Sequence, residues 1–87
     1  MLNLLAKSGI RRKILLLFVY NQEREFYLSE IARHVKTSAG TAQRELNKLR
    51  ATDFIIFKKR GNLSLYRLNP EFPLLAEIEA IVRKTVG

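Results

Sequence analysis

Amide, hydroxyl and guanidinium side chains are concentrated between residues 38 and 44, where they could contact the bases of a nucleic acid. Gln43 can form paired hydrogen bonds with adenine, and Arg44 with guanine, in the major groove of DNA, each worth about 1–3 kcal/mol of discrimination. The preceding side chains are small, so the backbone can approach a duplex closely. They are Ser38, Ala39, Gly40 and Thr41. Taken alone, the segment is equally compatible with Gln43 and Arg44 being exposed polar residues without a role.

A second set of polar side chains follows, most of it around Gly61. Its members are Lys48, Lys58, Lys59, Arg60, Asn62 and Arg67. Basic and amide groups of this kind contact phosphates and fix the position of a protein on a duplex. Lysines at a hairpin tip also protect an edge strand against aggregation. Because the segment directly follows Gln43 and Arg44, contact with phosphates or with the minor groove is the favoured interpretation.

The charge distribution points to a polyanionic partner. The 87-residue chain has 16 basic and 8 acidic residues, a formal net charge of +8. Residues 28–67 hold nine of the basic residues and only three acidic ones, whereas residues 69–82 hold glutamates and no lysine or arginine. A basic surface concentrated in one part of a small domain is typical of nucleic-acid binding.

Two short helices around a tight break are predicted for residues 28–51. Over residues 28–35, apolar side chains recur at spacings of three and four; they are Leu28, Ile31, Ala32 and Val35. Ser38 is suited to cap a second helix, and that helix would bury Ala42, Leu46 and Leu49. The same spacing leaves Gln43, Arg44 and Lys48 on its exposed side.

A β-hairpin is predicted next. Residues 53–59 and 63–69 are rich in Phe, Ile, Leu and Tyr, and they are joined across Gly61-Asn62. A glycine at the first of two turn positions predicts a type II′ turn. We expect Arg67 to alternate with the apolar residues of the returning strand, which are Leu63, Leu65 and Leu68.

Terminal helices are expected over residues 1–20 and 73–86. Ser8 can cap the first, whose apolar positions include Ile10, Ile14, Leu17 and Phe18, while Arg11, Arg12 and Lys13 are expected to form a solvated cluster. Pro73 can open the last helix, and its predicted apolar stripe is Leu74, Ile78, Ile81 and Val82. Together the two helices offer more apolar surface than so small a domain is expected to bury. We therefore expect a homodimer through residues 1–20 and 73–86; the alternative is that both helices complete a monomeric core.

Several classes of protein are not supported by the sequence. There is no cysteine, and His34 is the only histidine, so neither a thiolate nor a histidine-based metal site is expected. The longest apolar run, residues 14–20, is too short to span a bilayer. We find no pairing of a nucleophile with a base and no phosphate-binding glycine loop. The expectation is a cytoplasmic protein without enzymatic activity, cofactor, metal or membrane partner.

Residues 28–68 resemble the winged helix-turn-helix of ArsR/MarR-like bacterial and archaeal transcriptional regulators. The resemblance lies in LSEIARHV, in S-x-x-T-A-Q-R-E-L-N-K-L and in the FII that enters the hairpin. It implies a single domain over residues 1–87, mainly α with a small hairpin: a three-helix core, a wing over residues 53–69 and a C-terminal helix. It also implies that the helix after Ser38 recognises double-stranded DNA in the major groove, and that Lys58 to Asn62 form the wing tip.

The chain departs from this family at two positions where many relatives have glycine. Lys36 and Asp53 occupy places that often need a left-handed backbone, which aspartate tolerates better than lysine. We therefore expect a wider turn at Lys36. An alternative function also remains: the run from Gly61 to Gly87 is similar to winged-helix modules that precede nucleotidyltransferase-like domains, which would make the chain a regulatory or docking module.

Overall fold

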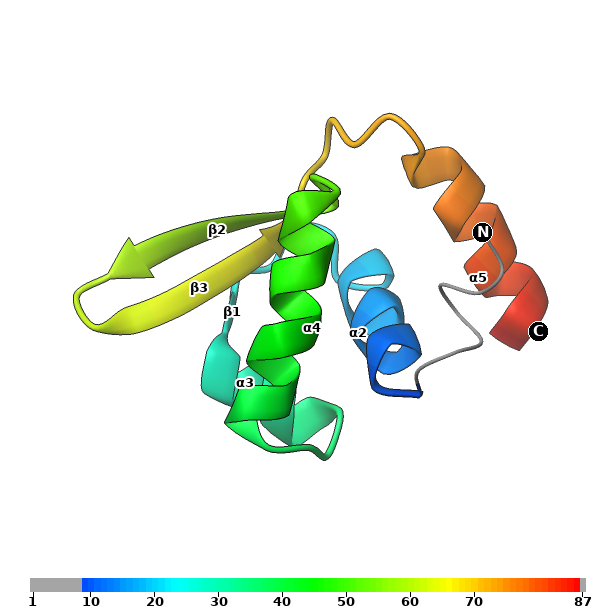
Figure 1. Cartoon of the computed structure of the whole chain (residues 1–87). Coiled ribbons are helices and arrows are strands. Elements are labelled where there is room, and N and C mark those ends of the chain that lie inside the picture. The colour runs from blue at the N-terminus through cyan, green and yellow to red at the C-terminus, as the bar shows by residue number, and fades with distance from the viewer. Residues whose placement is uncertain (1–8, 87) are drawn as a thin grey trace.

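The computed structural model describes residues 9–86 (Figure 1). Its elements are, in order, α2 (Gly9–Val19), β1 (Phe26–Tyr27), α3 (Leu28–His34), α4 (Ala39–Ala51), β2 (Ile55–Arg60), β3 (Leu63–Leu68) and α5 (Leu75–Val86). The three strands form one antiparallel sheet in the order β1-β3-β2. The expected class, mainly helical with a small hairpin, is confirmed. Ser8, the predicted cap of the first helix, lies outside the described residues.

The helix-turn-helix is formed by α3 and α4. The backbone N–H of Tyr27 donates to Glu30 Oε1 at 2.8 Å and so helps to start α3. Ser38 is the N-cap of α4, and its hydroxyl accepts from the backbone N–H of Thr41 at 3.1 Å, as predicted. The buried residues of α4 are Ala42, Leu46 and Leu49, also as predicted.

The hairpin has the predicted two-residue turn. Arg60 pairs with Leu63, and Gly61 has a φ of 62°. Asn62 is not among the described residues with positive φ, so the two φ signs are those of a type II′ turn and not of type I′. Only glycine takes such a φ without a steric cost, which explains Gly61.

The pairing register corrects the prediction for Arg67. Leu63, Leu65 and Arg67 are two residues apart along β3, so their side chains lie on the same face of the sheet. Arg67 therefore alternates with Leu68 but shares a face with Leu63 and Leu65. Its cross-strand partner on β2 is Ile56.

The core is built around α2 and a short strand that the sequence patterns did not reveal. Ile14, Leu15 and Phe18 are fully buried, and the ring of Phe18 meets that of Phe26 edge-on at 5.5 Å. Phe26 belongs to β1, which pairs with β3 through Phe26 and Tyr66. Two residues are too few to produce an alternating pattern, so β1 appears only once its partner strand is in place.

The last helix begins later than predicted. It starts at Leu75, two residues after Pro73, and Leu74 is 51% exposed outside it. Ile78 and Val82 are buried in the core, as the predicted stripe requires. Leu74 was therefore wrongly assigned to that stripe, because the helix has not yet formed at its position.

The prediction of a solvated basic cluster at the start of α2 is wrong for Arg11 and Arg12. Arg11 Nε donates to Glu45 Oε1 at 2.8 Å, and these side chains are only 19% and 14% exposed. Arg12 is half-buried, and only Lys13 is exposed. Because α2 packs against α4, the side chain of Arg11 is mostly covered. Burial alone would raise the pKa of Glu45, but the hydrogen bonds and charges of Arg11 and Lys48 together outweigh this and hold the pKa below its ordinary value.

The Arg11–Glu45 pair should give the fold a pH-dependent contribution. Because the pKa of Glu45 is lowered in the folded protein, the contribution is present above the ordinary value of 4.5 and is lost as the pH falls through the lowered value. Glu45→Gln should therefore cost about 1 kcal/mol of unfolding free energy at neutral pH. Denaturant unfolding against pH should show this gap closing below the ordinary value. The exposed Glu71→Gln is the control, and a gap for Glu45→Gln that stays constant down to low pH would contradict the account.

Lys36 and Asp53 both have a left-handed backbone. Their φ values are 58° and 66°, so each residue takes a conformation that glycine adopts more readily than any other residue. We expected a wider turn at Lys36, but Lys36 itself adopts the left-handed conformation, so a tight turn can form there. A side chain in this region costs about 1–2 kcal/mol.

Lys36→Gly should therefore stabilise the domain by up to about 1 kcal/mol, because the removal of Cβ relieves this cost while greater freedom of the unfolded chain offsets part of it. Lys36→Ala is the matched control, since it removes the same charge but keeps Cβ. Thermal or denaturant unfolding should rank Lys36→Gly above Lys36→Ala. Equal stabilities for the two variants would show that the backbone at this turn carries no strain.

Candidate nucleic-acid interface

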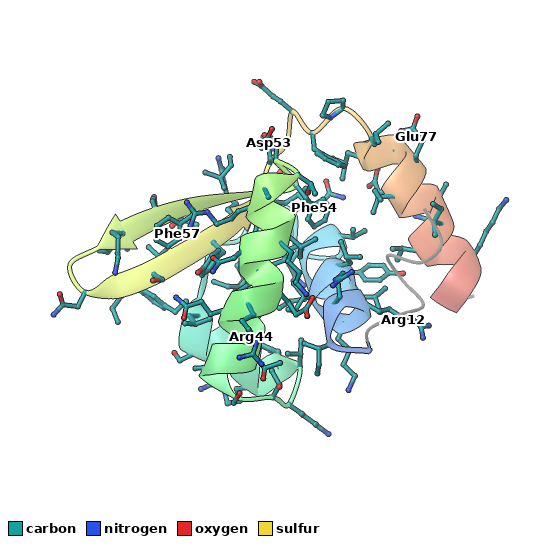
Figure 2. All side chains as sticks on the ribbon, in the orientation of Figure 1. Arg12, Arg44, Asp53, Phe54, Phe57 and Glu77 are labelled. Atoms are coloured by element: carbon teal, nitrogen blue, oxygen red, sulfur yellow. The ribbon has the colours of Figure 1, made fainter. Side chains whose placement is uncertain are left out.

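The exposed side of α4 carries the side chains expected to read bases. Residues 38–40, Gln43, Arg44 and Lys48 are exposed, and Thr41 is half-buried. Figure 2 shows Arg44 on the N-terminal half of the helix, with Asp53 beyond its C-terminal end. The buried side of α4 packs on the core, so its polar side faces outward as a consequence of the helical period.

Arg44 is held along its own helix. Its Nη2 donates to Thr41 Oγ1 at 3.1 Å, and Ser38 Oγ donates to the same oxygen at 3.0 Å. Arginine has five N–H donors, so this contact leaves others for a base edge. The hydroxyls thus restrict the guanidinium to the N-terminal half of α4. The spacing of three residues between Thr41 and Arg44 was the available sequence signal for this contact.

The basic residues of the wing divide between the two faces of the sheet. Lys58, Arg60 and Arg67 share one face with Ile56, whereas Lys59 lies on the other face with Phe57. Among these, Arg67 is half-buried and the three tip residues are exposed. The sequence grouped these residues into one set, but the register separates Lys59 from the others.

Arg50 joins the wing to α4. Its guanidinium carbon lies 4.1 Å from the ring centroid of Phe57, which Figure 2 shows on the hairpin beside α4. A cation over an aromatic face is attracted by the ring quadrupole. Arg50 had no assigned role in the sequence, since its partner on β2 becomes adjacent only after folding. The contact fixes how the wing is set against the helix.

One carboxylate lies among the wing cations. Lys58 Nζ is 2.6 Å from Glu25 Oε2, and Arg60 Nη2 is 3.9 Å from Glu25 Oε1. The hydrogen bond from Lys58, with the charges of Arg60 and Arg67, lowers the pKa of Glu25 against a smaller effect of burial. Glu25 lies in the loop directly before β1, so its position beside the wing follows from the pairing of β1 with β3, which the sequence patterns did not reveal. A comparable pair links Lys48 Nζ to Glu45 Oε2 at 3.6 Å.

A groove of about 220 Å³ connects the wing tip to the start of α4. Its walls come from three places in the chain: Tyr27 to Ser29 at the start of α3, Ala39 on α4, and Asn62 to Ser64 on the hairpin. Ala39 and Asn62, both predicted contact residues, therefore border the same hollow. The structure brings the two predicted parts of the site onto one continuous surface.

The terminal helix lies away from this surface. In Figure 1, the hairpin and α5 are at opposite ends of the molecule, with α4 and α2 between them. Within residues 9–86, no group of three or more His, Cys, Asp or Glu side chains is placed to hold a metal ion. None of the helices in this part of the chain has the length and apolar character needed to cross a bilayer.

Comparison with known proteins shows similarity in structure but not in sequence. No protein-family model matches the chain, and no curated protein is significantly similar to it. Among solved structures, NolR from Sinorhizobium fredii is 21% identical with a TM-score of 0.75, covering 99% of this chain and 80% of NolR. HlyU from Vibrio cholerae is 19% identical with a TM-score of 0.69, covering 97% of this chain and 82% of HlyU.

A third similar structure is described as a homodimeric winged helix-turn-helix DNA-binding domain. It is the 1–100 fragment of Mb0332 from Mycobacterium bovis, a candidate ArsR-family transcriptional regulator. It is 23% identical, with a TM-score of 0.70, and the match covers 97% of this chain and 76% of that fragment. The order of elements, the capped α4 and the three-stranded sheet agree with this architecture. The chain therefore has the winged helix-turn-helix fold.

Proposed function

We propose that the chain binds double-stranded DNA sequence-specifically as a prokaryotic transcriptional regulator of the ArsR type, acting in the cytoplasm. In this proposal α4 enters the major groove, where Gln43 and Arg44 read bases, and the wing meets the backbone or the minor groove. Close approach of α4 is allowed by the small residues from Ser38 to Thr41. Phosphate contacts come from Lys48, Lys58, Lys59, Arg60 and Arg67.

The observation that carries this proposal is the continuous surface formed by the start of α4 and the wing tip. Ala39 and Asn62 border one groove, and the basic side chains of α4 and of the hairpin tip are exposed. A helix and a basic hairpin arranged in this way can contact bases and adjacent phosphates together. A DNA-binding domain, Mb0332, has the same fold. The similar structures do not favour the docking-module alternative, and Mb0332 is described as a candidate transcriptional regulator.

Base reading and phosphate binding should separate in two variants. Arg44→Ala should weaken binding to a duplex selected from a random pool by about 1–3 kcal/mol and change binding to a scrambled duplex much less. Lys59→Ala should weaken binding to both duplexes equally and lower the slope of log affinity against log salt by about one. Fluorescence anisotropy over a salt series measures both effects. Equal losses on both duplexes for both variants would contradict the division of roles.

We also propose that the DNA-binding unit is a homodimer formed through the N-terminal region and α5. Apolar side chains are partly exposed there. Tyr20, which directly follows α2, is 57% exposed, and Ile81 on α5 is half-buried. Mb0332, whose fold is the same, is homodimeric. A two-fold axis at this end would leave both wings free and could place two α4 helices about 34–36 Å apart on one duplex face.

Analytical ultracentrifugation at tens of micromolar protein should therefore show a dimer. Ile81→Glu should shift it toward monomer, because a charge would be buried at the interface, whereas Ile56→Glu on the distant wing should leave it dimeric. Both variants must keep the helical circular dichroism of the original chain. A monomer throughout the concentration range would contradict the proposal, leaving α2 and α5 as parts of a monomeric core.

A further inference from the structure

Glu25 places an internal anion beside the cations on one face of the wing. Both of its carboxylate oxygens are engaged, Oε2 by Lys58 at 2.6 Å and Oε1 by Arg60 at 3.9 Å. Arg67 lies on the same face of the sheet and contributes to the positive field at the carboxylate. Three of the four basic wing residues thus face a single internal anion.

These cations are still accessible to another ligand. The side chains of Lys58 and Arg60 are 52% and 62% exposed, whereas that of Glu25 is 34% exposed. An incoming phosphate can therefore reach the ammonium and guanidinium groups, but it must approach a carboxylate of the same sign. Like charges repel, and because the ion pair is exposed to solvent it holds its partners only weakly, an effect of about 1.4- to 5-fold on binding.

Lys59 provides the internal comparison. It lies on the opposite face of the hairpin, next to these residues in sequence, and no carboxylate of the described residues is paired with it. On the wing, Lys59 is therefore directly available to phosphate, whereas Lys58 and Arg60 share the single negative charge of Glu25. Their difference follows from the alternation of side chains along β2.

We propose that Glu25 acts as an internal competitor of DNA phosphate, holding Lys58 and Arg60 and limiting the sequence-independent affinity of the wing. The inference rests on the proposed DNA binding and names a residue that tunes it. Phosphate contacts add affinity for every duplex without reading sequence, so a wing with fewer of them depends more on the base contacts made by α4. Glu25 makes no contact with a base in this mechanism.

Substitution of Glu25 by glutamine tests the proposal directly. Glu25→Gln should bind a scrambled duplex about two- to fivefold more tightly at low salt, because the competing anion is removed. Its slope of log affinity against log salt should become steeper by about one, since further phosphate contacts form. Glu23→Gln changes the net charge equally from an exposed position two residues earlier and should have a much smaller effect on both quantities.

A double-mutant cycle then identifies the residues involved. Lys58→Ala should cost less affinity in the original chain than in the Glu25→Gln background, whereas Lys59→Ala should cost the same in both. Unfolding midpoints of all variants establish that each is folded. Equal affinities for Glu25→Gln and Glu23→Gln, or weaker binding by Glu25→Gln, would overturn the inference while leaving DNA binding intact. Absence of binding by every folded variant would instead overturn the proposed function.

Discussion

Burial of one side of α4 is the constraint on which the rest of the structure depends. Ala42, Leu46 and Leu49 are at most 2% exposed, and the helical period then leaves Gln43 and Arg44 on the outside. The Ser38 cap determines where the helix starts, so it also determines which residues lie at its exposed leading end. If the buried positions moved by one residue along the helix, these side chains would turn by about 100° relative to the core.

Two contacts from other elements hold α4 in place. Arg11 on α2 pairs with Glu45 across 34 residues of sequence, and Arg50 lies over Phe57 of the wing. The first contact sets α4 against the core, and the second sets the hairpin against α4. Both contacts involve side chains of α4. The position of the wing relative to the base-reading side chains is therefore held by packed residues, and a binding surface needs such a rigid support.

Local features of the sequence were sufficient for most of the fold. The spacing of apolar residues predicted α3 and α4, Ser38 predicted the start of α4, and Gly61 predicted the hairpin turn. Each of these depends on residues within about four positions of one another. Features that depend on distant contacts were missed or wrong: β1 needs β3, and the roles of Arg11 and Glu25 need partners from other elements. The error at Arg67 was different, because its face already follows from counting along the strand.

The net charge of +8 does not show that the basic residues of this small domain differ in their surroundings. Carboxylates at Glu25 and Glu45 pair with Lys58, Arg60 and Lys48, so several basic residues near the surface are not equivalent. Composition predicts a polyanionic partner, whereas the pairing predicts which cations meet it first. The register of β2 and β3 decides this, because it sends Lys59 to one face and its neighbours to the other.

The central claim is that the exposed side of α4 and the wing tip form one DNA-binding surface. Its most direct test is an NMR titration in which the backbone amides of the isotope-labelled chain are followed as a duplex selected from a random pool is added. The account predicts that the largest amide shifts fall at residues 38–48 and 58–62, with little change across α5. Large shifts confined to α5, or to α2 and the residues beside it, would place the DNA elsewhere and contradict the account.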